Sequence, residues 1–151
     1  MTTYIAAYDV EGKGCLDALR KILPLHERFE IPLTLFIVAR LLDDQGDEYR
    51  ELLADHPLVE VASHSYTHML LRDHRACGKA GPPEQYEREI AGSKQRLEEH
   101  FDCEVAGFRA ACSFDIGLRG APELLALFDD AGYRYVSTLA WAPGYKLPAL
   151  I

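Results

Sequence analysis

Residues 58–68 read LVEVASHSYTH, an apolar run that leads directly into two histidines spaced four positions apart. The short apolar part, residues 58–62, is typical of a strand buried in a parallel sheet. The polar part begins where that strand ends. In α/β proteins the carboxyl ends of parallel strands meet at one edge, and functional sites assemble there. This stretch therefore predicts an α/β fold with a site at the end of this strand.

The same alternation of strand and helix continues along the rest of the chain. Further strands are expected at residues 3–8, 33–38, 105–108 and 133–138. Helices are expected at residues 15–29, 47–54, 83–100 and 121–131. Pro24 should kink or end the first helix, and Gly132 suits the C-cap of the last. Strands that alternate with helices predict a largely parallel sheet or barrel with its helices outside.

Length and charge bound the class of protein. A chain of 151 residues fits a single hydrophobic core, so we expect one domain over residues 1–151. The net charge is −8, from 24 acidic and 16 basic residues, and the sequence holds no basic stripe. These features argue against nucleic acid as a partner and against binding to anionic membranes.

Neither a leader nor a membrane span is indicated by the sequence. The N-terminal MTTYIAAYDVEG has no basic region and no long apolar stretch. The longest apolar-rich run, residues 31–42, is too short to cross a bilayer. A cytoplasmic location is therefore expected.

The cysteines suggest neither a metal site nor a disulfide framework. Cys15, Cys77, Cys103 and Cys112 are widely spaced, and no Cys-x-x-Cys pair occurs. We expect them to be ordinary free thiols, partly buried.

Two pairs of polar residues follow predicted strands. His64 and His68 would share one face if their segment were helical, so that one metal ion could accept a nitrogen from each. Asp9 and Glu11 would point to the same side of an extended strand, and two such close carboxylates favour a cation between them. Two histidines with one carboxylate suit a divalent transition metal, and the second carboxylate could act as a general base. Taken singly, each pair also fits exposed residues at strand ends.

A third polar feature is Arg109 in the segment GFRAA, residues 107–111, at the end of another predicted strand. An arginine there could brace a carboxylate through a charge-assisted hydrogen bond. An exposed surface arginine would fit the sequence equally well.

Three segments in this order resemble the motifs of the NodB-type polysaccharide deacetylases, carbohydrate esterase family four. They are AYDVEG at residues 7–12, SHSYTH at 63–68 and GFRAACS at 107–113. The segments at residues 84–101 and 131–139 also resemble that family. The resemblance implies a distorted (β/α) barrel that removes acetyl groups from sugars with one divalent ion, most often Zn²⁺. It implies Glu11, His64 and His68 as metal ligands, Asp9 as catalytic base and Arg109 as the residue that orients Asp9.

The sequence departs from that family's pattern at several points. Val10 separates the two acids, as in an atypical branch that includes hydrolases of cyclic amides. Glu11 is one methylene longer than the usual aspartate, and Ala111 stands where a proline is expected. No histidine follows His100, whereas the family has a late leucine-x-x-histidine motif that supplies a general acid.

These departures shape our expectations for this chain. We expect an incomplete barrel without its C-terminal strands, which binds metal with weak or no turnover. Uncovered strand edges and apolar surface would favour association, including a homo-oligomer.

Three alternatives to an acetylated carbohydrate substrate stay open at this point. One is hydrolysis of small cyclic amides or ureides, as in allantoinase-like enzymes. Another is a non-catalytic carbohydrate- or metal-binding module in which Tyr66 and Phe114 stack on sugar rings. The last is an α/β domain whose acids and histidines are ordinary surface residues.

Overall fold

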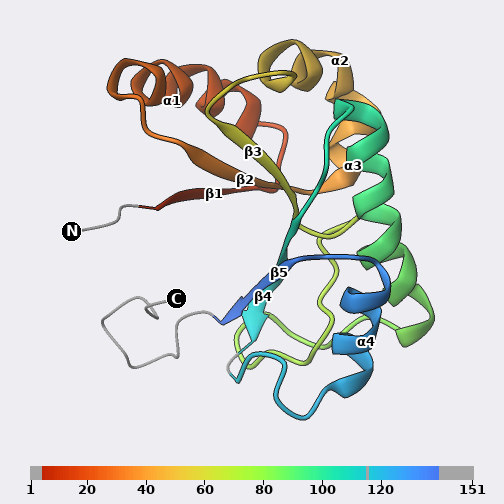
Figure 1. Ribbon diagram of the computed structural model, residues 1–151. Helices are drawn as coiled ribbons and strands as arrows, with labels where there is room; N and C mark the ends of the chain where they lie inside the picture. Colours follow the sequence, from red (N-terminus) through yellow and green to blue (C-terminus); the bar gives the residue numbers. More distant parts are fainter. Residues whose placement is uncertain (1–4, 115, 140–151) are drawn as a thin grey trace.

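The computed structural model describes residues 5–114 and 116–139, and in these residues five strands pair into one parallel sheet. The strands are β1 (Ala6–Val10), β2 (Leu33–Ile37), β3 (Val59–Ser63), β4 (Gly107–Phe114) and β5 (Tyr135–Leu139). Their order in the sheet equals their order in the chain, and every pairing is parallel. The sheet twists strongly from β1 to β5 and curls into half a barrel (Figure 1). The predicted incomplete (β/α) barrel is therefore confirmed.

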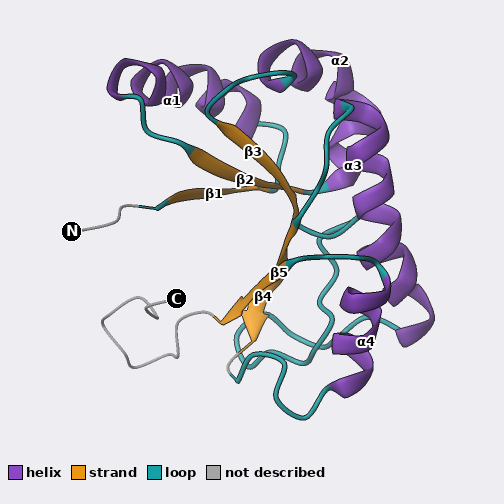
Figure 2. Ribbon diagram, viewed as in Figure 1, coloured by secondary structure: helices purple, strands orange, loops and turns teal. Residues whose placement is uncertain are grey.

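The helices lie along one face of this sheet (Figure 2). They are α1 (Cys15–Phe29), α2 (Leu42–Leu53), α3 (Ser93–Phe101), α4 (Pro122–Asp130) and the shorter η1 (Ala39–Leu41), η2 (Pro83–Gln85) and η3 (Arg88–Gly92). Alternate residues of β2 point toward them, and Leu33, Leu35 and Ile37 are almost fully buried in the core. Among the described residues, no helix has the length and apolar character needed to cross a bilayer.

The opposite face of the sheet carries polar side chains. Thr34 Oγ1 donates a 2.6 Å hydrogen bond to Glu60, and the hydroxyl of Tyr135 donates one of 2.9 Å to the same carboxylate. Asp9 and Arg109 lie on this face as well, joined at 2.7 Å. The parallel register thus gathers polar groups from distant parts of the chain onto one surface.

Most predicted elements are confirmed within a few residues, but β4 runs on to Phe114 instead of ending at residue 108, so Arg109 lies inside the strand. Residues 3 and 4 of the first predicted strand lie outside the described residues. Three helical segments also differ from the prediction. The helix at residues 15–29 continues through Pro24, which is exposed, so water can satisfy the carbonyl left without its donor. The second helix begins at Leu42 instead of residue 47, with a non-helical residue at Gln45. The segment predicted as one helix at residues 83–100 is a 3₁₀ turn, a π-helical turn and then α3.

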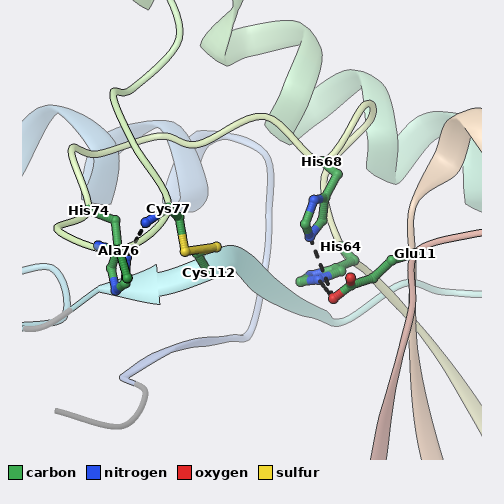
Figure 3. Close-up of a disulfide and its surroundings, with 7 residues drawn as sticks. All are labelled: Glu11, His64, His68, His74, Ala76, Cys77 and Cys112. Carbon is green, nitrogen blue, oxygen red and sulfur yellow. Dashed lines mark hydrogen bonds and ion pairs between the residues drawn. A yellow bond between two sulfur atoms is a disulfide. The ribbon is translucent and has the colours of Figure 1, made fainter. Parts of the chain in front are cut away.

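The prediction that all four cysteines are free thiols is wrong for two of them. Cys77 and Cys112 form a disulfide, whereas Cys15 and Cys103 are free. The bond ties the loop that follows the histidine segment to β4 (Figure 3). Because the two cysteines stand 35 residues apart, only the fold brings them together, and their spacing gives no sign of it.

Candidate metal centre

Three side chains converge at the carboxyl edge of the sheet, as the strand pattern predicted. Glu11 follows β1, His64 follows β3, and His68 lies four residues further along. Glu11 Oε1 is 3.2 Å from His64 Nε2 and 3.5 Å from His68 Nε2. One ligand atom from each residue lies within 4.8 Å of the other two, and all three side chains point to one place (Figure 3).

His64 is fixed in position and in its hydrogen-bonding state. It is buried, with 1% of its surface exposed, and its Nδ1 lies 2.8 Å from the carbonyl oxygen of Arg109. A carbonyl can only accept, so Nδ1 carries the proton. In the neutral ring Nε2 is then an unprotonated acceptor facing the Glu11 carboxylate. Two acceptors at this distance call for a proton or a cation between them, and such a backbone partner is typical of histidine ligands.

His68 provides the second nitrogen. Its Nε2 is buried and makes no hydrogen bond within the described part of the chain, although Glu11 Oε1 lies nearby. Burial, followed by the neighbouring His64, lowers the pKa of His68. The neutral imidazole, which is the form that ligates a metal, is thereby favoured.

The two histidines do not meet on the face of a helix. Residues 64–68 form an irregular loop in which Ser65 and His68 have positive φ angles of 66° and 67°. Ser65 Oγ accepts a 2.9 Å hydrogen bond from the His68 amide, and the carbonyls of Ser65 and Tyr66 accept bonds from Ala39 and Arg40. The loop therefore rests on η1, and its folded backbone brings the two rings to a centroid distance of 4.9 Å.

Asp9 and Arg109 form an ion pair beside these three residues. Arg109 Nη1 lies 2.7 Å from Asp9 Oδ1, and Arg109 Nε donates a 3.2 Å hydrogen bond to Ser137. The guanidinium also lies over the ring of Phe36, 3.9 Å from its centroid. Asp9 stands two residues before Glu11, and the carbonyl of Arg109 binds His64, so the pair lies close to the three converging side chains. Arg109 therefore binds the Asp9 carboxylate, and the catalytic roles that the resemblance implied for these two residues stay predictions.

The two aromatic residues considered for sugar stacking have other partners. Phe114 is buried in the core, with the Arg72 guanidinium 5.7 Å from its ring centroid. Tyr66 is half-buried, and the Arg88 guanidinium lies 4.5 Å from its ring centroid. Both rings therefore already pack within the protein.

A family model described as Polysaccharide deacetylase matches residues 11–136. The chain belongs to the polysaccharide deacetylase family. The predicted resemblance to NodB-type deacetylases is thereby confirmed. A search of curated protein sequences finds no match to it.

Solved structures of polysaccharide deacetylases share its fold. A polysaccharide deacetylase from Bacillus cereus matches with a TM-score of 0.65 and 20% identity, over 90% of this chain and 40% of its own. A Streptococcus pyogenes deacetylase in complex with acetate gives 0.70 and 13%, over 90% and 55%. A carbohydrate esterase family four pseudoenzyme from Bacillus anthracis gives 0.66 and 15%, over 88% and 42%. The chain thus spans about half the length of these structures or less.

Sequence reasoning missed two residues that support the site in this deacetylase fold. Ser137 holds Arg109, and the buried Glu89 binds the loop that carries the histidines. A serine in a strand and a glutamate in a charged helical segment are common features, so neither gave a signal. Only their contacts across the fold reveal them.

Proposed function

We propose that this chain carries the site of a divalent-metal-dependent deacetylase that acts on acetylated carbohydrates. The observation that carries the proposal is the convergence of Glu11, His64 and His68, with acceptor atoms facing one another and the buried His68 Nε2 lacking a hydrogen bond. Buried polar atoms are almost always paired, so this arrangement supports a cation as the missing partner.

The three residues fit a transition-metal ion. Two imidazole nitrogens and one carboxylate suit Zn²⁺ or a similar ion, and leave positions for water and substrate. His64 has its tautomer fixed by the Arg109 carbonyl, and burial lowers the pKa of His68, which favours its neutral form. An ion bound there supplies Lewis acidity, which makes water a better nucleophile and polarises a carbonyl.

The neighbouring residues provide the proton chemistry. Asp9 is the base: Arg109 binds its Oδ1, so Oδ2 takes the proton from the attacking water. Ser137 and the ring of Phe36 also hold the Arg109 guanidinium, so it stays oriented toward Asp9. Water adds to the acetyl carbonyl, the proton taken by Asp9 passes to the leaving nitrogen as the C–N bond breaks, and the products are acetate and a sugar amine.

The test is the metal content of a double variant, His64→Ala with His68→Ala. Purified protein is loaded with Zn²⁺, separated from free ion by gel filtration, and measured by elemental mass spectrometry. We expect about one ion per chain in the wild type and a small fraction of that in the variant. His56→Ala, which removes a histidine bonded to Glu27 away from the site, is the matched control and should retain its metal. Unchanged metal content in the double variant would contradict the proposal.

The substrate class has one competing candidate. Val10 stands between the two acids, which is the pattern of the branch that includes cyclic-amide hydrolases. The two candidate substrate classes can be distinguished by incubating metal-loaded protein with acetylated chito-oligosaccharides and, separately, with a cyclic imide. We expect slow release of acetate from the first, in keeping with the weak turnover expected of this chain, and no ring opening of the second. Sugar binding without release of acetate would instead favour a non-catalytic role.

A further inference from the structure

A buried carboxylate lies beneath the loop that carries the two histidines. Glu89 is 1% exposed and belongs to η3, far in sequence from that loop. Its Oε2 accepts hydrogen bonds from the amides of Tyr66 and Thr67, at 3.0 Å and 2.8 Å. Its Oε1 accepts a third bond, of 2.7 Å, from the Thr67 hydroxyl. One side chain thus binds both residues at the centre of the segment between His64 and His68.

The loop needs such a partner because it is irregular on both sides of this contact. β3 has ended at Ser63, so the amides of Tyr66 and Thr67 have no neighbouring strand to bind. Ser65 and His68 adopt positive φ angles that residues with side chains rarely take. A conformation of this kind persists only where surrounding contacts determine it.

The π-helical turn of η3 belongs to the same arrangement. Arg88–Gly92 interrupts an otherwise helical segment, and single π turns often occur where a helix serves a functional site. Within it Glu89 and Ile90 are buried, whereas Arg88 and the preceding Glu87 are exposed. The turn therefore presents one carboxylate inward to the loop and leaves the two residues before it in solvent.

We propose that Glu89 is a positioning residue for the metal centre, which holds residues 64–68 in the one conformation that aims both imidazoles at Glu11. The proposal rests on the proposed metal site. Glu89 itself acts through the backbone and approaches no ligand nitrogen in the contacts described above. Residues one step removed from a metal commonly alter its affinity by about 10–100-fold when they are replaced.

Two substitutions separate the role of hydrogen bonding from that of charge. Glu89→Gln keeps a carbonyl oxygen for the two backbone amides, and the Thr67 hydroxyl can turn to accept from the new NH₂ group. Glu89→Met keeps the length of the side chain but accepts no strong hydrogen bond. If hydrogen bonding positions the loop, glutamine should preserve the site and methionine should not. Glu87→Gln removes the same charge from the exposed side of the segment and is the control.

The experiment measures two quantities for the wild type and each variant. The first is hydrogen exchange at the amides of Tyr66 and Thr67 in metal-free protein, followed by NMR and compared with the amide of Ile37 in β2. The second is Zn²⁺ affinity, measured by competition with a chromophoric chelator. For Glu89→Met we expect exchange to accelerate and affinity to fall, each by about tenfold or more. Glu89→Gln should stay within about threefold of the wild type, and Glu87→Gln should be unchanged.

The exchange measurement keeps the two proposals distinct. If the wild type binds no Zn²⁺, the proposed function fails, while exchange at Tyr66 and Thr67 still decides the role of Glu89. Unchanged exchange in folded Glu89→Met overturns the positioning role, as does a loss of affinity in Glu89→Gln with an intact loop. Should Glu89→Met not fold, Thr67→Val removes one of the three bonds. Faster exchange at the Thr67 amide supports the proposal, and an unchanged rate overturns it.

Discussion

The two sides of the candidate site are built differently. His64 extends from β3, which pairs with β2 on one side and β4 on the other, and its side chain is 2% exposed. Asp9 and Glu11 lie on and just after β1, which pairs with β2 alone among the described strands, and their side chains are 36% and 47% exposed. His64 is thus preorganised, and although the side chain of His68 is 31% exposed, hydrogen bonds within residues 65–68 and to Glu89 hold its loop, whereas Glu11 can adapt. Precision in this site comes from the histidine side, and an ion would order the rest.

Loss of the disulfide should have the largest effect, which is on the free energy of unfolding. The bond ties the loop after the histidines to β4, the strand that carries Arg109. Replacing Cys77 and Cys112 by serine should lower the free energy of unfolding by about 2–4 kcal/mol, because the bond closes a loop of 35 residues. Urea denaturation of the variant and of a Cys15→Ser, Cys103→Ser control measures this difference. Four reactive thiols in the folded wild-type protein would contradict the bond itself.

The disulfide also bears on where the protein works. Such bonds persist in oxidising compartments and are uncommon in the cytosol. Cys77 is exposed, so reductants can reach it. The cytoplasmic location expected from the N-terminal sequence stays a prediction, and the redox state of this pair in cells would test it.

The next largest effect is on Zn²⁺ affinity, and variants of one ligand from each side of the site are compared. His64→Ala should weaken Zn²⁺ binding on the order of 100-fold, because a buried, oriented ligand has little conformational freedom left to lose when the ion binds. Glu11→Ala should weaken it only about tenfold, since the exposed glutamate must give up side-chain freedom and water can replace it. Competition titrations give both affinities. Equal losses would mean that the acid side is as preorganised as the histidine side.

The sheet and the positions of the main site residues could be predicted because their signals are local. The apolar runs at β2 and β3 and the helical period at Cys15–Phe29 are each contained in a few residues. The end of a strand is visible in the sequence, so Glu11 and His64 could be assigned to one edge of the sheet. Parallel pairing then makes their meeting a consequence of the fold.

The remaining features depend on contacts between distant residues. Whether His64 and His68 share a helical face could not be decided from their spacing, and the loop that joins them is instead held by Glu89, more than twenty residues away. The interruption of the helix at Arg88–Gly92 goes with that contact, since Glu89 lies within the π turn. Propensity favours a continuous helix there, and tertiary hydrogen bonds override it.

The smallest expected effect is on the free energy of unfolding at high pH. It tests how Tyr133 and η3 support the histidine side of the site. Tyr133 is buried against η3, and its hydroxyl donates a 2.9 Å hydrogen bond to the carbonyl of Ile90, next to Glu89. Burial raises the pKa of Tyr133 to about 12, from 10 in the unfolded chain. The neutral hydroxyl is therefore favoured by folding, and its contribution to stability is complete below pH 10. As the pH rises from 10 toward 12, the unfolded chain releases its proton first, so the free energy of unfolding should fall by about 1–2 kcal/mol.

Tyr133→Phe isolates this contribution. The variant should fold, because Ser93 Oγ still donates a 2.9 Å hydrogen bond to the Ile90 carbonyl that Tyr133 leaves. Its free energy of unfolding, measured by urea denaturation at intervals between pH 9 and pH 11.5, should fall less steeply than that of the wild type. Some slope will persist, since burial also raises the pKa of Tyr49 to about 12. Identical slopes in the two proteins would mean that Tyr133 ionises as freely in the folded state as in the unfolded chain. The support behind η3 would then be open to water, and the contrast between a rigid histidine side and an adaptable acid side would lose its physical basis.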